Sequence, residues 1–187
     1  MVELIFKDEF RTMDDILTTL ATFDLYCMKN DIEAELVILG GSALLMVIEM
    51  QNGNFRATRD IDVDIVRTND MKGLMKQIRN FNIDIVGGVM EVPPHEDFVD
   101  PENYTELDLE FKAIKVLLPS IELLACTKIF TKRGKDLEDL ENTDILVRCD
   151  KEKLLAMVEE YQMNLLNPSD PFLNYHELDR LFKEKGI

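Results

Sequence analysis

Three aspartates alternate with aliphatic residues in the segment Asp60-Ile-Asp-Val-Asp64. If this segment is a strand, Asp60, Asp62 and Asp64 share one face, because successive side chains point to opposite sides of a sheet. Side chains two residues apart on that face are only about 7 Å apart, so the carboxylates repel one another. The pattern therefore favours a bound divalent cation. A solvated edge strand is the alternative interpretation, although aspartate is depleted in strands.

A glycine turn precedes this acidic segment. The apolar run 36–39 predicts a buried strand, and Gly40-Gly41-Ser42 leads from it into an apolar helical segment. Glycines let backbone N–H groups approach a phosphate, and Ser42 is expected to cap a helix whose N-terminus favours anions. An anion site beside clustered carboxylates suits the phosphates of a metal-bound nucleotide.

Three other motifs fit these residues less well. Counted from Asp60, a calcium-binding EF-hand loop lacks its glycine at position 6 and its glutamate at position 12. A Walker-type phosphate loop requires a lysine between its last glycine and the Ser or Thr, and Gly41-Ser42-Ala43 has none. A phosphatase of the haloacid dehalogenase type, built on Asp62-Val63-Asp64, has no supporting nucleophile near the start of the chain.

The two segments together resemble the nucleotidyltransferase superfamily, which includes DNA polymerase beta-like enzymes. The resemblance rests on Leu39-Gly-Gly-Ser42 and on Asp60-Ile-Asp62. It is closest to the abortive-infection nucleotidyltransferases, including toxins of toxin–antitoxin pairs, where an Arg and a Thr or Ser often precede the acidic pair. Arg56, Thr58 and Arg59 match that feature.

A second stretch, with Lys128 followed by Arg133-Gly-Lys-Asp136 and Asp139, is also similar to the abortive-infection group. The resemblance implies that Lys128 faces the nucleotide phosphates and that Asp136 lies at the site, with Asp139 as a further candidate. Independently, the basic residues between 128 and 135 form a local anion patch in an acidic chain. The alternative interpretations are a solvated helix face for the lysine and stabilisation of a helix dipole for the aspartates.

Members of the superfamily generally carry a third carboxylate on a neighbouring strand. Residues 107–111 alternate between apolar and acidic side chains, which predicts a strand with Asp108 and Glu110 on one face. The sequence does not choose between Asp108 and Glu110, and a solvated face remains the alternative for each.

Composition limits the classes of function. With 21 basic and 37 acidic residues, the net charge of −16 argues against sequence-independent binding to DNA or to anionic membranes. The three cysteines show no paired spacing, which favours free thiols in a reducing cytoplasm. We expect a cytoplasmic protein, because no targeting segment is visible and the longest apolar run, 36–48, is too short to span a bilayer.

The periodicity predicts an α+β fold with a mixed sheet and flanking helices. Apolar residues at helical spacing predict helices over residues 8–29, 43–50 and 69–81, and mainly helical structure after residue 120. We expect a nucleotidyltransferase core at 1–119 and a helical C-terminal subdomain at 120–187, packed on the core.

The predicted function is metal-dependent transfer of a nucleoside monophosphate from an NTP. Asp60 and Asp62 are expected to hold Mg²⁺ or Mn²⁺, with Asp108 or Glu110 as third ligand or general base. Gly40, Gly41, Ser42 and Lys128 are expected to hold the triphosphate. The acceptor hydroxyl, on a protein, a tRNA or a small molecule, stays open. The alternative is an inactive nucleotide- or partner-binding module, antitoxin-like or regulatory.

Overall fold

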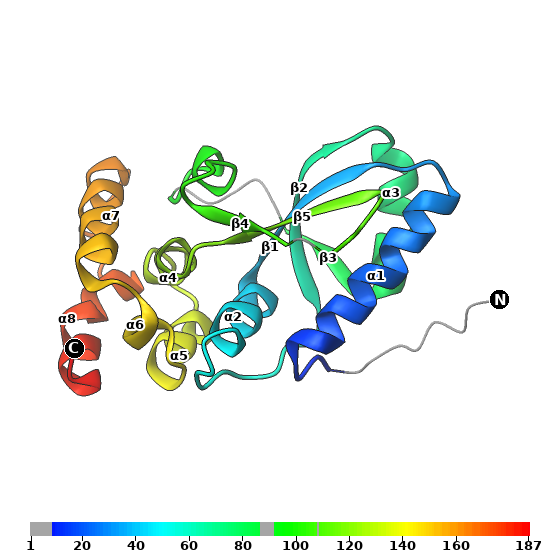
Figure 1. Cartoon of the computed structure of the whole chain (residues 1–187). Coiled ribbons are helices and arrows are strands. Elements are labelled where there is room, and N and C mark those ends of the chain that lie inside the picture. Colours follow the sequence, from blue (N-terminus) through cyan, green and yellow to red (C-terminus); the bar gives the residue numbers. More distant parts are fainter. Residues whose placement is uncertain (1–8, 87–91, 108) are drawn as a thin grey trace.

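The computed structural model describes residues 9–86, 92–107 and 109–187, which form a mixed sheet with helices around it (Figure 1). The strand order is β3-β2-β1-β5-β4. The central strand β1 runs antiparallel to β2 and parallel to β5. The predicted α+β class is confirmed. The strands are β1 (Ala34–Leu39), β2 (Ile61–Thr68), β3 (Ile83–Ile85), β4 (Tyr104–Glu106) and β5 (Ile114–Pro119).

The helices fall into two groups. The first group is α1 (Met13–Lys29), α2 (Gly40–Glu49) and α3 (Met71–Gln77), with the 3₁₀ turns η1 (Ile78–Phe81) and η2 (His95–Phe98). The second is α4 (Ile121–Ile129), α5 (Gly134–Asn142), α6 (Ile145–Arg148), α7 (Lys151–Asn164), η3 (Asn174–Glu177) and α8 (Leu178–Lys185). In Figure 1, α1 and α2 lie below the sheet, and the second group gathers at the end away from α3.

The helix α1 begins later than predicted, at Met13, because Thr12 provides a capping box with Asp15. Ile16, Leu20 and Phe23 then form its buried stripe. Before the helix, Phe10 pairs with Thr58 through two backbone hydrogen bonds of 2.7 and 3.0 Å. The start of the described chain is therefore attached to the loop that precedes β2.

The strand predicted at 107–111 is wrong for the residues described there. The strand β4 ends at Glu106, and Glu110 has a left-handed backbone with φ of 54°. The buried carboxylate of Asp24, from α1, then accepts the backbone N–H groups of residues 112, 113 and 114. After β4 the chain therefore leaves the sheet, and it returns to it at β5. Asp108 lies outside the described residues.

The core lies between the sheet and the helices that cover it. The residues 41–48 of α2 are all buried, as the unbroken apolar sequence predicted, and α2 contacts β1, β2 and α4. The predicted helix over 172–182 is divided into η3 and α8. Helices follow residue 120 as expected, while the domain division at residue 119 stays a prediction. Within the described ranges, no helix is long and apolar enough to cross a membrane.

Candidate active site

The turn between β1 and α2 requires glycine at position 40. Gly40 has φ of +60°, a backbone conformation that L-residues rarely adopt. A Cβ atom at this position would also lie 2.0 Å from Oδ2 of Asp62. The absence of a side chain therefore lets the carboxylate of Asp62 lie directly against the first residue of α2.

Ser42 links this turn to β2 and is not the cap residue of α2. The N-cap position is Leu39, without a side-chain cap. The buried hydroxyl of Ser42 donates to the Leu39 carbonyl at 2.8 Å and accepts from the backbone N–H of Asp62 at 3.2 Å. The expectation that Ser42 caps the helix is wrong, since its hydroxyl instead joins the end of β1 to the start of β2.

The start of β2 brings carboxylates together, and β3 adds one that the sequence interpretation missed. In the parallel pairing of β2 with β3, Asp62 lies opposite Asp84. Burial, together with the negative charges of Asp60 and Asp84, raises the pKa of Asp62 to about 6. Burial is the largest of these causes. The detectable signal was Ile83-Asp84-Ile85, an acidic residue between aliphatic residues, but its proximity to Asp62 depends on strand pairing.

Of the two expected third carboxylates, the described one, Glu110, does not reach this cluster. Glu110 lines a separate pocket with Ala34 and Thr68, at the end of β1 and β2 opposite to Gly40 and Asp62. Asp108 lies outside the described residues. Asp84 is therefore the described carboxylate that the sheet register places beside Asp62.

A cleft of about 610 Å³ opens over the turn and the acidic face of β2. Its floor is formed by Leu39, Gly40, Asp62 and Asp64, which lie at the end of β1, the start of α2 and on β2. The opposite wall comes from α4 and the start of α5. The remaining wall is largely apolar and consists of Val86, Pro93 and Phe98, with His95 beside them. The cleft therefore joins a polar floor to an apolar wall.

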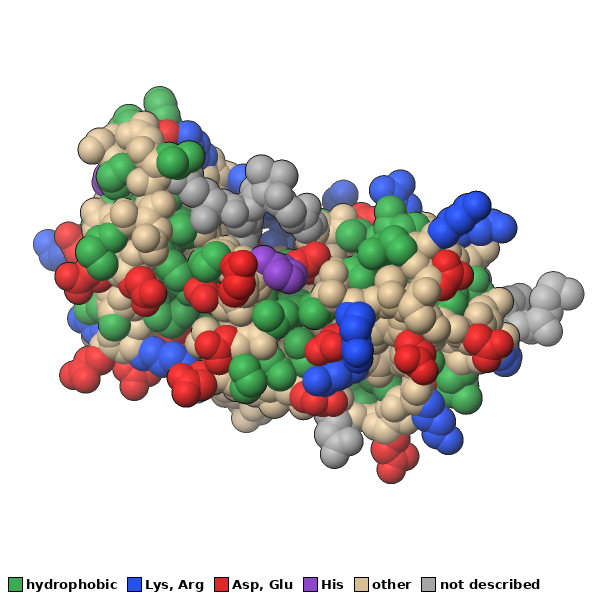
Figure 2. Space-filling model, turned by 90° about the horizontal axis from the view of Figure 1, so that it is seen from above, with side chains coloured by type: hydrophobic (Ala, Val, Ile, Leu, Met, Phe, Trp, Pro, Cys, Tyr) green, Lys and Arg blue, Asp and Glu red, His purple; other side chains and the backbone are tan. Residues whose placement is uncertain are grey.

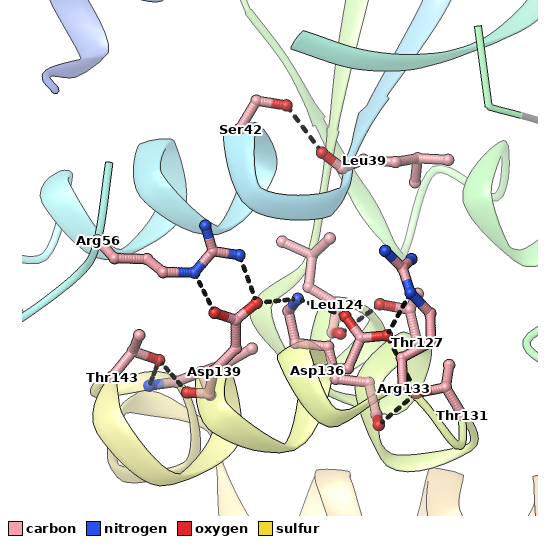
Figure 3. A network of polar contacts seen from close by, with 12 residues as sticks. Leu39, Ser42, Arg56, Leu124, Thr127, Thr131, Arg133, Asp136, Asp139 and Thr143 are labelled. Atoms are coloured by element: carbon pink, nitrogen blue, oxygen red, sulfur yellow. Dashed lines mark hydrogen bonds and ion pairs between the residues drawn. The ribbon is translucent and has the colours of Figure 1, made fainter. Parts of the chain in front are cut away.

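Lys128 lines the cleft but is almost fully enclosed, with 2% of its surface exposed. Its Nζ lies 2.6 Å from Oδ2 of Asp139 and 3.3 Å from Oδ1 of Asp136. Asp139 also binds Arg56, with 3.0 Å between Arg56 Nη2 and Asp139 Oδ2 (Figure 3). The structure therefore brings Lys128, Asp136 and Asp139 together in a buried ionic network, while the contact of Lys128 with nucleotide phosphates stays a prediction.

This network connects the helical wall of the cleft to the loop before β2. Burial alone acts to raise the pKa of Asp139, but hydrogen bonds and charges from Arg56 and Lys128 lower it below its usual value. The Arg56 guanidinium also lies against Gly41, where a Cβ would be 3.4 Å from Nη2. Because two carboxylates balance its charge, Lys128 is not an isolated cation in the cleft.

Two exposed basic residues at the start of α5 have a different relation to Asp62. Arg133 lines the cleft with 71% of its side chain exposed, and Lys135 follows on the first turn of the helix. Their positive charges act to lower the pKa of Asp62, opposing the effects of burial and of its acidic neighbours. In Figure 2, basic side chains form separate small groups among widely spread acidic ones. Arg133, which lies 3.7 Å from Asp136, and Lys135 are exposed basic groups whose charges act on Asp62.

The donor set fits a hard divalent cation that shares its coordination with a substrate. Within the described ranges, no group of three or more His, Cys, Asp or Glu side chains is arranged to hold a metal. Mg²⁺ is usually bound through one or two carboxylates, with substrate phosphates and water completing its shell. Asp60 and Asp62 supply such oxygens, and their mutual repulsion is relieved by a cation.

The mixed sheet, the glycine turn into α2 and the acidic start of β2 define a nucleotidyltransferase fold. Residues 16–184 match the sequence profile described as nucleotidyltransferase of unknown function (DUF6036), so the chain belongs to this family. Comparisons with curated proteins and with solved structures gave no match. The family assignment supports the superfamily resemblance, while the abortive-infection or toxin–antitoxin subgroup stays a prediction.

Proposed function

We propose that this protein transfers a nucleoside monophosphate from an NTP to a hydroxyl acceptor with the help of Mg²⁺ or Mn²⁺. The observation that carries the proposal is the position of Asp62. Its carboxylate lies against the glycine that begins α2, and the charges of Asp60 and Asp84 raise its pKa while those of Lys135 and Arg133 lower it. Carboxylates and cations that meet in one cleft suit a metal-bound triphosphate.

In this proposal the acidic and basic walls have different tasks. Asp60 and Asp62 hold the cation, with Asp84 as the third carboxylate. The bound metal supplies charge neutralisation on the phosphoryl oxygens. Arg133 and Lys135 bind the triphosphate, while the network of Lys128, Asp136, Asp139 and Arg56 fixes the position of α5 against the loop before β2. The apolar wall at Val86, Pro93 and Phe98 excludes water from one side of the nucleotide.

Two features bear on the acceptor. The net charge of −16 favours a protein hydroxyl or a small molecule over a long nucleic acid. A tRNA end is also a candidate acceptor, because the exposed basic residues Lys132, Arg133 and Lys135 can contact its phosphates. We also propose that the protein belongs to a toxin–antitoxin pair, because residues 128–139 resemble those of the abortive-infection nucleotidyltransferases.

The test is release of pyrophosphate from each of the four NTPs with Mg²⁺ or Mn²⁺, with cell extract, tRNA or water as acceptor. We expect activity in the wild type and a loss of at least about 100-fold in Asp62→Asn, the scale on which transition-state charge stabilisation contributes. Asp14→Asn, an exposed aspartate of α1, is the matched control and should keep full activity. A wild type that binds NTP without releasing pyrophosphate under any condition would contradict transfer and favour the inactive binding module.

A further inference from the structure

His95 and Asp64 form a pair at the edge of the cleft, which the family assignment does not explain. Nδ1 of His95 lies 2.9 Å from Oδ2 of Asp64. Asp64 is on β2, on the same face as Asp62 and two residues further along, about 7 Å away. Both members of the pair line the cleft with Asp62. An imidazole is therefore held at the site by a carboxylate that belongs to the acidic face.

The segment that carries His95 is anchored by the two residues at its end, Asp97 and Phe98. Phe98, at the end of η2, is buried and lines the same cleft. Asp97 accepts a hydrogen bond from the hydroxyl of Tyr161 on α7. The His95 side chain itself is 52% exposed, while that of Asp64 is 22% exposed. The backbone of η2 is thus fixed, and the imidazole remains accessible from the cleft.

The contact with Asp64 leaves one imidazole nitrogen available. When Nδ1 donates its proton to a carboxylate, Nε2 is the basic nitrogen and can accept a proton. Among the described residues, no hydrogen bond occupies Nε2 of His95. The charged side chains lining the cleft around the pair are Asp62, Lys128, Arg133 and Asp136, with Glu96 and Asp97 on the segment of His95 itself.

We propose that His95 is the general base that accepts the proton of the acceptor hydroxyl, and that Asp64 is the positioning residue that fixes its tautomer and orientation. This inference rests on the proposed nucleotidyl transfer. The acceptor O–H bond breaks and its proton passes to Nε2. The acceptor oxygen forms a bond to the α-phosphorus, the bond from the α-phosphorus to the bridging oxygen breaks, and pyrophosphate leaves with that electron pair. The imidazolium then returns the proton to water.

A purely structural tether between η2 and β2 is the competing explanation for the same contact. The two explanations differ in which substitutions they tolerate. His95→Asn places an amide N–H where Nδ1 lies, so it retains a donor to Asp64 but offers no basic nitrogen. A tether predicts that His95→Asn stays active, whereas a general base predicts that it does not.

The experiment measures pyrophosphate release by wild type, His95→Asn, Asp64→Asn and the double variant, with the metal and NTP saturating. We expect His95→Asn to lose about 100-fold or more in rate, the usual contribution of general base catalysis, while its Kd for the metal–NTP complex stays unchanged. Asp64→Asn should lose a comparable factor. The double variant should be no slower than His95→Asn, because the two residues act as one unit. His176→Asn, at the other histidine of the chain, is the control and should be unaffected.

Chemical rescue provides a readout that a structural role does not move. In His95→Ala, added imidazole should restore pyrophosphate release in a concentration-dependent manner, and it should not do so in Asp62→Asn. Wild-type rates in His95→Asn, multiplicative losses in the double variant, or absence of rescue would overturn the general base assignment while leaving nucleotidyl transfer intact. An inert wild type would overturn the proposed function and this inference with it.

Discussion

Asp62 is the residue at which the chemistry of the cleft converges. Its carboxylate lies against Gly40, its backbone N–H donates to the hydroxyl of Ser42, and its strand neighbour in β3 is Asp84. When no cation is present, the ionised form of such a carboxylate is destabilised, because burial and like charges both oppose its ionisation. The cost of ionising Asp62 is therefore part of the stability of the metal-free protein.

The stability of the metal-free protein should depend on pH through this group. Because the pKa of Asp62 is about 6 in the folded protein and near 3.9 in an unfolded chain, the folded state binds more protons between these values. Stability should therefore fall as pH rises from about 4 to about 6. Asp62→Asn should remove this decrease and raise the free energy of unfolding at pH 7 by roughly 1–2 kcal/mol, after allowance for solvent screening.

The measurement is urea unfolding at several pH values in the presence of EDTA, for the wild type and the Asp62→Asn variant. Asp14→Asn is the control, because this exposed side chain lies on α1. A variant that is less stable than the wild type at pH 7 would show that Asp62 is stabilised by partners rather than opposed by its acidic neighbours.

At the scale of elements, the turn from β1 into α2 sets the distance between the helix and the acidic strand. Gly40→Ala should disturb this turn, because alanine at φ of +60° costs about 1–2 kcal/mol and its Cβ overlaps the Asp62 carboxylate. We expect displacement of Asp62 and a loss of about 100-fold in pyrophosphate release, the cost of about 1 Å of misplacement.

Gly134→Ala is the matched control for this substitution. Gly134 begins α5, and a Cβ there would meet no atom within 4 Å. Stability should stay the same or rise by up to about 1 kcal/mol, since alanine favours helix more than glycine does. Equal activity in both glycine variants would show that Gly40 does not position Asp62.

The buried ionic network joins three elements, namely α4, α5 and the loop before β2. A lysine that only binds phosphates or lies on a solvated helix face, as the sequence suggests for Lys128, could be removed without affecting the fold. In the structure, Lys128 is the enclosed cation that contacts both buried carboxylates, so its removal leaves Asp136 without that partner and Asp139 with Arg56 alone. We now expect a loss of about 3–5 kcal/mol in stability, measured by urea unfolding.

Lys135→Ala separates phosphate binding from stability. Lys135 is exposed on the first turn of α5 and its charge acts on Asp62. Its removal should weaken binding of the metal–NTP complex by roughly tenfold, equivalent to about 1.4 kcal/mol, with unchanged unfolding. If calorimetry shows equal affinity in this variant while unfolding is unchanged, Lys135 does not contact the triphosphate.

For the whole molecule, the dominant electrostatic feature is the net charge of −16. Self-repulsion of this size destabilises the compact state and is screened by salt, whereas the enclosed pairs of Lys128 are screened much less. Raising NaCl from about 0.05 to about 0.5 M, with EDTA present, should therefore raise the melting temperature. A gain of roughly 1 kcal/mol corresponds to about 2–4 °C for a chain of this size.

The opposing contribution comes from exposed ion pairs, which salt weakens. Arg180 of α8 makes three of them, with Glu177, Glu141 and Glu184 at 2.7, 2.7 and 2.8 Å. Such pairs are individually worth little in water. A melting temperature that falls with added NaCl would mean that these pairs outweigh the repulsion among the acidic residues.

The local features of the fold can be predicted from the amino-acid sequence, because they depend on periodicity and on the backbone preferences of neighbouring residues. The alternating aspartates at the start of β2, the glycine turn into α2 and the apolar stripe of α1 were all readable in this way. The resemblance of residues 39–62 to nucleotidyltransferases rests on the residues of two short motifs, Leu39-Gly-Gly-Ser42 and Asp60-Ile-Asp62.

Which distant residues share the site depends on how the strands pair and how the helices pack. The pairing of β2 with β3 puts Asp84 beside Asp62, and the capping of residues 112–114 by Asp24 ends the alternation that had favoured Glu110. The contacts of Lys128 with two carboxylates and of His95 with Asp64 join elements far apart in the chain. No local pattern encodes these contacts, because strand register and helix packing are fixed by burial of the whole core.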